Sequence, residues 1–191
     1  MVTDGVPKPT QLRAEYVRSD KTRGLELPGD DRFLRAARGI EDALVTEEAA
    51  PVRTACVEFL RLAAEYYEVS MPQVRVLRAR PIRVREGGWG TELFGDYHFD
   101  ERLIRVWMRT AIQKRVTSFG TFFATLCHEF CHHLDRERFG FTETPHTRGF
   151  YERTAALYHH GRSTPAKRLC WAPFFGGRWR IDWPRTNRGG R

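Results

Sequence analysis

Residues 125–135 of the chain read Thr-Leu-Cys-His-Glu-Phe-Cys-His-His-Leu-Asp and contain the pattern H-E-x-x-H. His128 and His132 are four residues apart, so on a helix both imidazoles project from one face and can bind a single metal ion. Glu129 lies about 100° further round the helix, where its carboxylate can take a proton from a water on that metal. The stretch therefore predicts a zinc site in which Glu129 is the catalytic residue.

The residues around this pattern favour a helix with two different faces. Steps of about 100° per residue place one set of side chains on a continuous arc that we expect to face the core: Phe119, Phe123, Leu126, Cys127, Phe130, Cys131 and Leu134. The opposite arc carries the two histidines among small or polar residues, which leaves a metal accessible. The alternative is a pair of surface histidines on an ordinary amphipathic helix.

Two neighbours of the pattern have different expected roles. Asp135 lies one turn after His132 on the same face, so it is a candidate to orient an imidazole from outside the ligand shell. A surface ion pair with a nearby arginine is the alternative. His133 points to another side of the helix, and we do not expect it to bind the metal.

Length and composition indicate one soluble domain in the cytoplasm. The 191 residues are 41% hydrophobic and 29% charged, which is typical of a globular protein. The sequence contains no apolar run long enough to span a membrane, and its first thirty residues contain no apolar signal-peptide core. Two of the four cysteines lie on the apolar arc of the motif helix, so we expect reduced thiols.

Hydrophobic periodicity along the chain predicts an α+β fold. Apolar residues at helical spacing indicate helices at 30–44, 50–68 and 151–160 in addition to the motif helix. Alternating residues indicate strands at 74–76, 82–84, 92–97 and 103–108, with a glycine-rich turn near 87–90. We expect these strands to form a small antiparallel sheet on which the helices pack.

The sequence divides into three parts. Residues 1–29 contain prolines and charges of both signs without a sustained period, which predicts a loosely ordered arm. Residues 30–161 form the domain that contains the motif. Residues 162–191 are a basic aromatic tail that carries most of the net charge of +8, and a hairpin is expected to turn at Gly176-Gly177. This tail either packs on the domain or extends from it to stack bases and neutralise phosphates.

A catalytic zinc ion usually takes three protein ligands and leaves one position for water. Two residues after the motif are candidates for the third ligand. Glu152 lies on the following predicted helix, an arrangement seen where a glutamate completes a zinc site, and His146 comes just before that helix. The metzincin continuation is excluded because Leu134 and Arg138 stand where that clan has glycine and histidine.

The order of these features resembles the SprT-like (Spartan-type) zinc metallopeptidases and the neighbouring WLM and YgjP-like groups. The resemblance covers residues 50–160. It rests on helices, a small sheet with Gly95-Asp96-Tyr97, H-E-x-x-H at 128–132 and H-x-x-x-F at 146–150. It implies a zincin-like fold, a Zn²⁺ cofactor, His146 rather than Glu152 as the third ligand, and a protein or peptide substrate.

The resemblance also implies two binding surfaces. An edge strand near 103–108 would hold an extended substrate by strand addition. Spartan-type proteins commonly carry a zinc ribbon or another DNA-binding extension. This chain lacks C-x-x-C pairs for a ribbon, so the basic tail is the candidate DNA contact. The alternative function is a non-catalytic zinc-containing module that binds nucleic acid or protein through the tail. The sequence does not indicate an oligomeric state.

Overall fold

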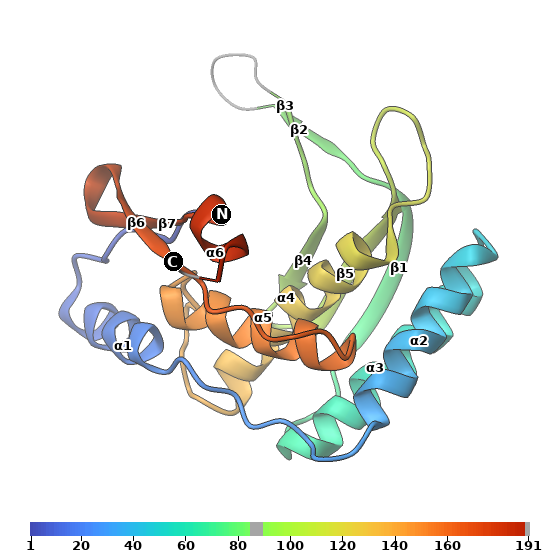
Figure 1. Cartoon of the computed structure of the whole chain (residues 1–191), viewed down its shortest axis with the longest axis horizontal. Helices are drawn as coiled ribbons and strands as arrows, with labels where there is room; N and C mark the ends of the chain where they lie inside the picture. The colour runs from blue at the N-terminus through green and yellow to red at the C-terminus, as the bar shows by residue number, and fades with distance from the viewer. Residues whose placement is uncertain (85–89, 190–191) are drawn as a thin grey trace. The chain divides into compact units, whose positions relative to one another are not determined.

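The computed structural model describes residues 1–84 and 90–189, and contains helices and strands in both of its units (Figure 1). One unit is residues 28–133, and the other is residues 1–27 together with residues 134–191. The predicted α+β class is therefore confirmed. Among the described residues, no helix is at once long enough and apolar enough to cross a membrane.

The unit 28–133 begins with two helices that pack side by side (Figure 1). They are α2 (Arg32–Val45) and α3 (Ala49–Tyr67), which confirms the two helices expected at 30–44 and 50–68. The rings of Phe33 and Phe59 are fully buried, with their centroids 5.6 Å apart. The apolar stripes that predicted the helices thus form part of the core of this unit.

The strands of this unit form a mixed sheet rather than an antiparallel one. Their bounds are β1 (Gln73–Ala79), β2 (Ile82–Val84), β3 (Gly90–Glu92), β4 (Gly95–His98) and β5 (Leu103–Arg109). The order is β1-β5-β4, with β5 parallel to β1 and antiparallel to β4, while β2 and β3 form a separate antiparallel pair. The predicted antiparallel pairing is wrong for β1 and β5, which run parallel. They can do so because the chain passes through β2, β3 and β4 between them, and β4 runs in the opposite direction to β5. The turn expected near 87–90 falls mostly outside the described residues.

Strand β5 lies between β1 and β4, so both of its edges are hydrogen-bonded. The prediction that residues 103–108 form a substrate-binding edge strand is therefore wrong. The burial pattern of β5 explains the difference, since five of its seven residues are buried, as in a central strand covered on both faces. The edges of this sheet are β1 and β4.

The motif lies on α4 (Phe119–Glu137), as the sequence predicts. Most of the expected core arc is buried, including Phe123, Leu126 and Phe130. Cys127 and Cys131 are buried free thiols on the same arc. Burial raises the pKa of the Cys127 thiol well above its ordinary value, so this cysteine behaves as an apolar core residue.

The other unit contains regular structure where the sequence predicted a loose arm. Its elements are α1 (Thr10–Lys21), α5 (Arg148–Gly161), β6 (Trp171–Phe174), the 3-10 turn η1 (Phe175–Gly177), β7 (Arg178–Ile181) and α6 (Trp183–Asn187). Helix α1 falls inside residues 1–29, the part of the chain for which the sequence predicts a loosely ordered arm. The hairpin of β6 and β7 is confirmed, and its turn contains Gly176 and Gly177 at positive φ.

Candidate metal centre

Helix α4 places two imidazoles side by side. His128 and His132 are four residues apart, and their Nε2 atoms lie 3.3 Å from each other. The two rings meet edge to face, with centroids 4.9 Å apart. His132 is buried and His128 is half-buried, so this pair lies in a sheltered position rather than on an open helix surface.

His146 stands immediately before the N-cap of α5. The helix starts here because the Thr147 side chain accepts a hydrogen bond from the amide of Phe150 at 3.1 Å. The ring of Phe150 meets the His146 ring edge-on at 5.1 Å between centroids, and the ring of Tyr151 stacks on it at 5.8 Å. The spacing H-x-x-x-F thus has a physical meaning, because the phenylalanine one turn into the helix fixes the orientation of the imidazole.

The structure brings His128, His132 and His146 together. Each offers one ring nitrogen, and these three nitrogens lie within 4.8 Å of one another. Such a group can hold a metal ion, and three neutral imidazoles match the donors found in catalytic zinc sites. Glu152, the alternative third ligand, is used elsewhere: its carboxylate accepts hydrogen bonds from Arg23 at 3.1 Å and from the Trp171 indole at 3.0 Å.

His133 follows a member of this group directly but uses its ring nitrogens in other bonds. Its Nδ1 lies 2.8 Å from the Tyr97 hydroxyl, and its Nε2 lies 2.7 Å from the Ser70 carbonyl oxygen. The side chain is fully buried. Both nitrogens are thus engaged inside the unit 28–133, as expected for a histidine that points away from the metal.

Glu129 is a buried carboxyl group close to the edge strand β4. Its side chain is only 5% exposed. Burial, and to a lesser extent the carboxylate of Asp96, raises the pKa of Glu129 to about 8. A group with this pKa can both give and take a proton near neutral pH, which is a requirement for general acid–base chemistry.

Gly95 is a site residue whose role the sequence did not reveal. A Cβ at this position would lie 2.6 Å from Cγ2 of Thr125 and 2.9 Å from Oε1 of Glu129. Because no side chain is present, β4 can pass directly against the Glu129 carboxylate. The sequence signals this role only through the glycine of Gly95-Asp96-Tyr97. The need for glycine there comes from Thr125 and Glu129, which lie about thirty residues further along the chain.

Asp135 forms a buried ion pair. Arg153 donates three hydrogen bonds to the Asp135 carboxylate, at 2.7, 2.8 and 3.1 Å, and both side chains are almost fully buried. Burial raises the pKa of Asp135 to about 6, although Arg153 and His146 act in the opposite direction. Asp135 thus pairs with an arginine, as the alternative prediction has it, but the pair is buried in the core rather than exposed on the surface. The prediction that Asp135 orients an imidazole stays a prediction.

The basic tail is partly packed and partly exposed. Trp171 packs beside Tyr151, with ring centroids 6.0 Å apart. At the tip of the hairpin Phe175 is 85% exposed, and the guanidinium of Arg178 lies 5.2 Å from the ring of Phe174. Exposed aromatic rings beside arginines are suited to stack bases. Binding of DNA by this surface stays a prediction.

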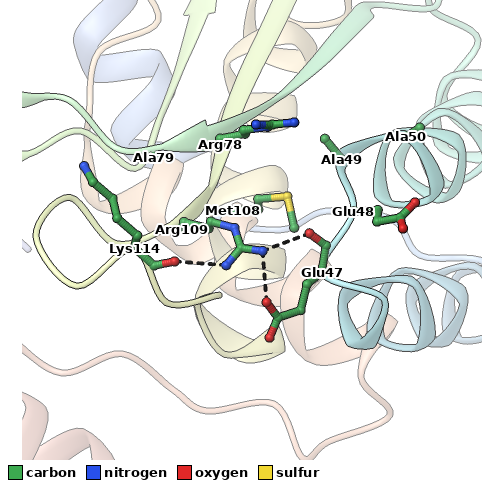
Figure 2. Close-up of a pocket in the computed structure, with 9 residues that line it drawn as sticks. All are labelled: Glu47, Glu48, Ala49, Ala50, Arg78, Ala79, Met108, Arg109 and Lys114. Atoms are coloured by element: carbon green, nitrogen blue, oxygen red, sulfur yellow. Dashed lines mark hydrogen bonds and ion pairs between the residues drawn. The ribbon is translucent and has the colours of Figure 1, made fainter.

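A pocket of about 860 Å³ lies at the start of α3 and the ends of β1 and β5, and none of the predicted site residues lines it (Figure 2). Glu47 and Lys114 on its rim both have left-handed backbone conformations, with φ of 57° and 56°. Arg109 joins them by donating to the backbone carbonyl of each at 3.0 Å and to the Glu47 carboxylate at 2.9 Å. Arg109 therefore holds two turns whose left-handed backbone conformation residues other than glycine rarely adopt.

Replacement of Arg109 by methionine is expected to lower the free energy of unfolding by about 1–3 kcal/mol, because two carbonyls and a carboxylate lose their charged donor. Urea denaturation followed by circular dichroism measures the loss. Arg78→Met is the matched control, since Arg78 lines the same pocket but is exposed. Equal losses in the two variants would contradict the role given to Arg109.

No protein-family model, curated protein or solved structure matches the chain. The family resemblance therefore stays a prediction. What the chain shows by itself is a group of three imidazoles that can hold a metal ion, with a buried glutamate adjacent to one of them in the sequence.

Proposed function

We propose that the chain is a zinc-dependent peptidase that hydrolyses peptide bonds with an activated water. The observation that supports this proposal is the grouping of His128, His132 and His146, with the buried Glu129 next to His128 in the sequence. A set of three imidazoles is typical of catalytic zinc sites, in which a fourth position is left for water, whereas structural zinc sites are commonly closed by cysteines. The two cysteines nearest the site are buried in the core instead.

In this mechanism, His128, His132 and His146 would hold a zinc ion, which would supply a Lewis acid to polarise the scissile carbonyl and lower the pKa of a water. Glu129 accepts the proton of the attacking water and delivers it to the leaving amine. Its buried position makes the protonated form accessible near neutral pH, which suits the delivery step. A metal cation in the site would favour the ionised form of the Glu129 carboxylate, which suits the acceptance step.

The proposed substrate is an extended segment of a protein or peptide. Strand β4 is an edge of its sheet, and Gly95 in that strand lies against Glu129. A peptide that added to β4 as a further strand would pass the catalytic carboxylate with its backbone extended. In this proposal β4 takes the role of the substrate-binding edge strand that the sequence analysis placed at 103–108.

A second candidate is a non-catalytic zinc-containing module that binds nucleic acid or protein through the tail. The observation in its favour is the exposed tip of the hairpin, where Phe174 and Phe175 lie near Arg178. Loss of hydrolysis on removal of Glu129, described in the Discussion, separates this candidate from a peptidase.

The ligand set is tested by elemental analysis of the purified wild type and of His146→Ala and Glu152→Ala. We expect about one zinc per chain in the wild type and in Glu152→Ala, and a clear loss in His146→Ala, because a site with two histidines binds weakly. Loss of zinc in Glu152→Ala alone would show that Glu152, and not His146, is the third ligand. If no variant binds metal even after zinc is added, the peptidase mechanism is wrong.

Activity is tested on an unfolded protein substrate, with cleavage followed by gel electrophoresis. Cleavage by the wild type should stop when a chelator removes the metal and return when zinc is added back. His146→Ala should be inactive under the same conditions, and Glu152→Ala should retain activity. Cleavage that survives the chelator would point to a contaminating protease or a different mechanism.

A further inference from the structure

The first residues of the chain lie along the hairpin of the tail. The amide of Ile181 donates to the Met1 carbonyl at 3.1 Å, and the amide of Thr3 donates to the Trp179 carbonyl at 2.8 Å. Val2 forms an antiparallel bridge with Arg180. Figure 1 shows the N-terminus close to β7. Residues 1–3 therefore run beside β7 at a fixed register.

This register presents Asp4 to His146. The Asp4 amide donates to the His146 carbonyl at 2.9 Å, and the His146 amide donates to Oδ2 of Asp4 at 2.8 Å. The same Oδ2 lies 3.2 Å from Nδ1 of the His146 ring. The Tyr16 hydroxyl further holds the Asp4 backbone by donating to its carbonyl at 3.0 Å. The carboxylate thus meets both the backbone and the imidazole of His146.

From this contact we infer that Asp4 is a positioning residue of the metal centre, an inference that rests on the metal site of the proposed function. The carboxylate accepts a hydrogen bond from Nδ1–H of His146, so Nε2 is the unprotonated nitrogen that faces the metal. Ligand histidines are commonly oriented in this way by a carboxylate on the opposite ring nitrogen, which also makes the imidazole a stronger donor.

The position of Asp4 suits this role better than a purely structural one. Its side chain is about half exposed, so its ion pair adds little to the stability of the fold. Anchoring of residues 1–4 also does not need the carboxylate, since Met1 and Thr3 provide backbone pairs with β7 and Tyr16 holds the Asp4 carbonyl. What the carboxylate adds is its contact with His146, both at the backbone amide and at the ring of this proposed metal ligand.

The experiment compares zinc affinity, by competition with a chelating dye, in wild type, Asp4→Ala, Asp4→Asn and Thr3→Val. We expect Asp4→Ala to bind zinc about 10- to 100-fold more weakly, and Asp4→Asn to lie between it and the wild type because an amide oxygen still accepts Nδ1–H without the charge. Thr3→Val is the matched control: it removes the 2.9 Å bond from the Trp179 amide to the Thr3 hydroxyl but leaves the carboxylate in place. Its zinc affinity should stay close to that of the wild type.

A second readout does not depend on metal or activity. Nitrogen NMR of the metal-free proteins should show His146 with its proton on Nδ1 in the wild type and a mixture of both tautomers in Asp4→Ala. Equal loss of zinc affinity in Asp4→Ala and Thr3→Val, or no change in Asp4→Ala, would overturn the inference. Wild type that binds no zinc overturns the inference and the proposed function together, whereas wild type that binds zinc but cleaves nothing overturns the proposed function alone.

Discussion

Glu129→Gln is expected to lower kcat/KM for peptide hydrolysis by about 10²- to 10⁴-fold while zinc remains bound at about one ion per chain. Glutamine has nearly the same shape as glutamate but cannot accept a proton. Glu129 is also not one of the three grouped nitrogen donors, so its replacement leaves the ligand set intact. Hydrolysis and zinc content are measured on the same preparation, so that loss of metal is not mistaken for loss of the base.

The matched control for this experiment is Glu137→Gln, which makes the same chemical change at the end of the same helix. Its kcat/KM should remain within about twofold of the wild type, because Glu137 lies about two helical turns beyond Glu129 on α4. Glu129→Gln with full activity would remove Glu129 from the mechanism. A wild type that binds DNA and never cleaves protein, with DNA binding unchanged in Glu129→Gln, would favour the non-catalytic module.

Arg153→Met is expected to lower the free energy of unfolding by about 3–5 kcal/mol, the largest stability change that we predict. The substitution leaves the Asp135 carboxylate buried without its partner. Arg153 also donates to the backbone carbonyls of Ser19, at 3.1 Å, and Thr22, which lie at the end of α1. One guanidinium therefore satisfies a buried charge and two carbonyls of a helix end.

Urea denaturation measures this loss, and two further variants show where it comes from. Asp135→Leu combined with Arg153→Met should recover part of the stability, because no uncompensated charge remains. Arg138→Met removes a surface ion pair with Glu26 in the same unit and should cost less than about 1 kcal/mol. Similar losses in Arg153→Met and Arg138→Met would contradict the importance given to the buried pair.

The parts of the site that depend on local spacing were predictable from the sequence. His128 and His132 lie on one helix face because they are four residues apart, and that relation does not depend on the rest of the fold. The apolar arc of α4 followed from the same period. The third histidine was different, since the residues alone left His146 and Glu152 open and only the family resemblance favoured His146.

Features set by distant parts of the chain were not predictable. The alternation in β1 and β5 indicates strands but contains no information about their relative direction, which depends on the path through β2, β3 and β4. Likewise, nothing near Asp4 in the sequence indicates that it meets His146, since the contact depends on the pairing of residues 1–3 with β7.

Helix α1 was missed because its buried positions are not apolar enough to give a helical period. Glu15 and Ser19 are both buried on this helix. Glu15 accepts hydrogen bonds from the amide and hydroxyl of Thr142 at 2.8 and 2.9 Å, and the Ser19 hydroxyl lies 2.9 Å from that of Thr147. A helix held in place by polar contacts gives little hydrophobic signal in the sequence.

The burial of Cys127, Cys131 and His133 has a consequence for the unfolded chain. In the fold these three side chains are enclosed, and only the neighbouring His128 and His132 join the group that can hold a metal. Once the helix melts, all five become available within seven consecutive residues and include two thiols, which bind zinc strongly. We therefore expect zinc to bind the unfolded state as well as the native one, and to protect the protein against denaturation less than its native affinity alone would. Refolding is best carried out before zinc is added.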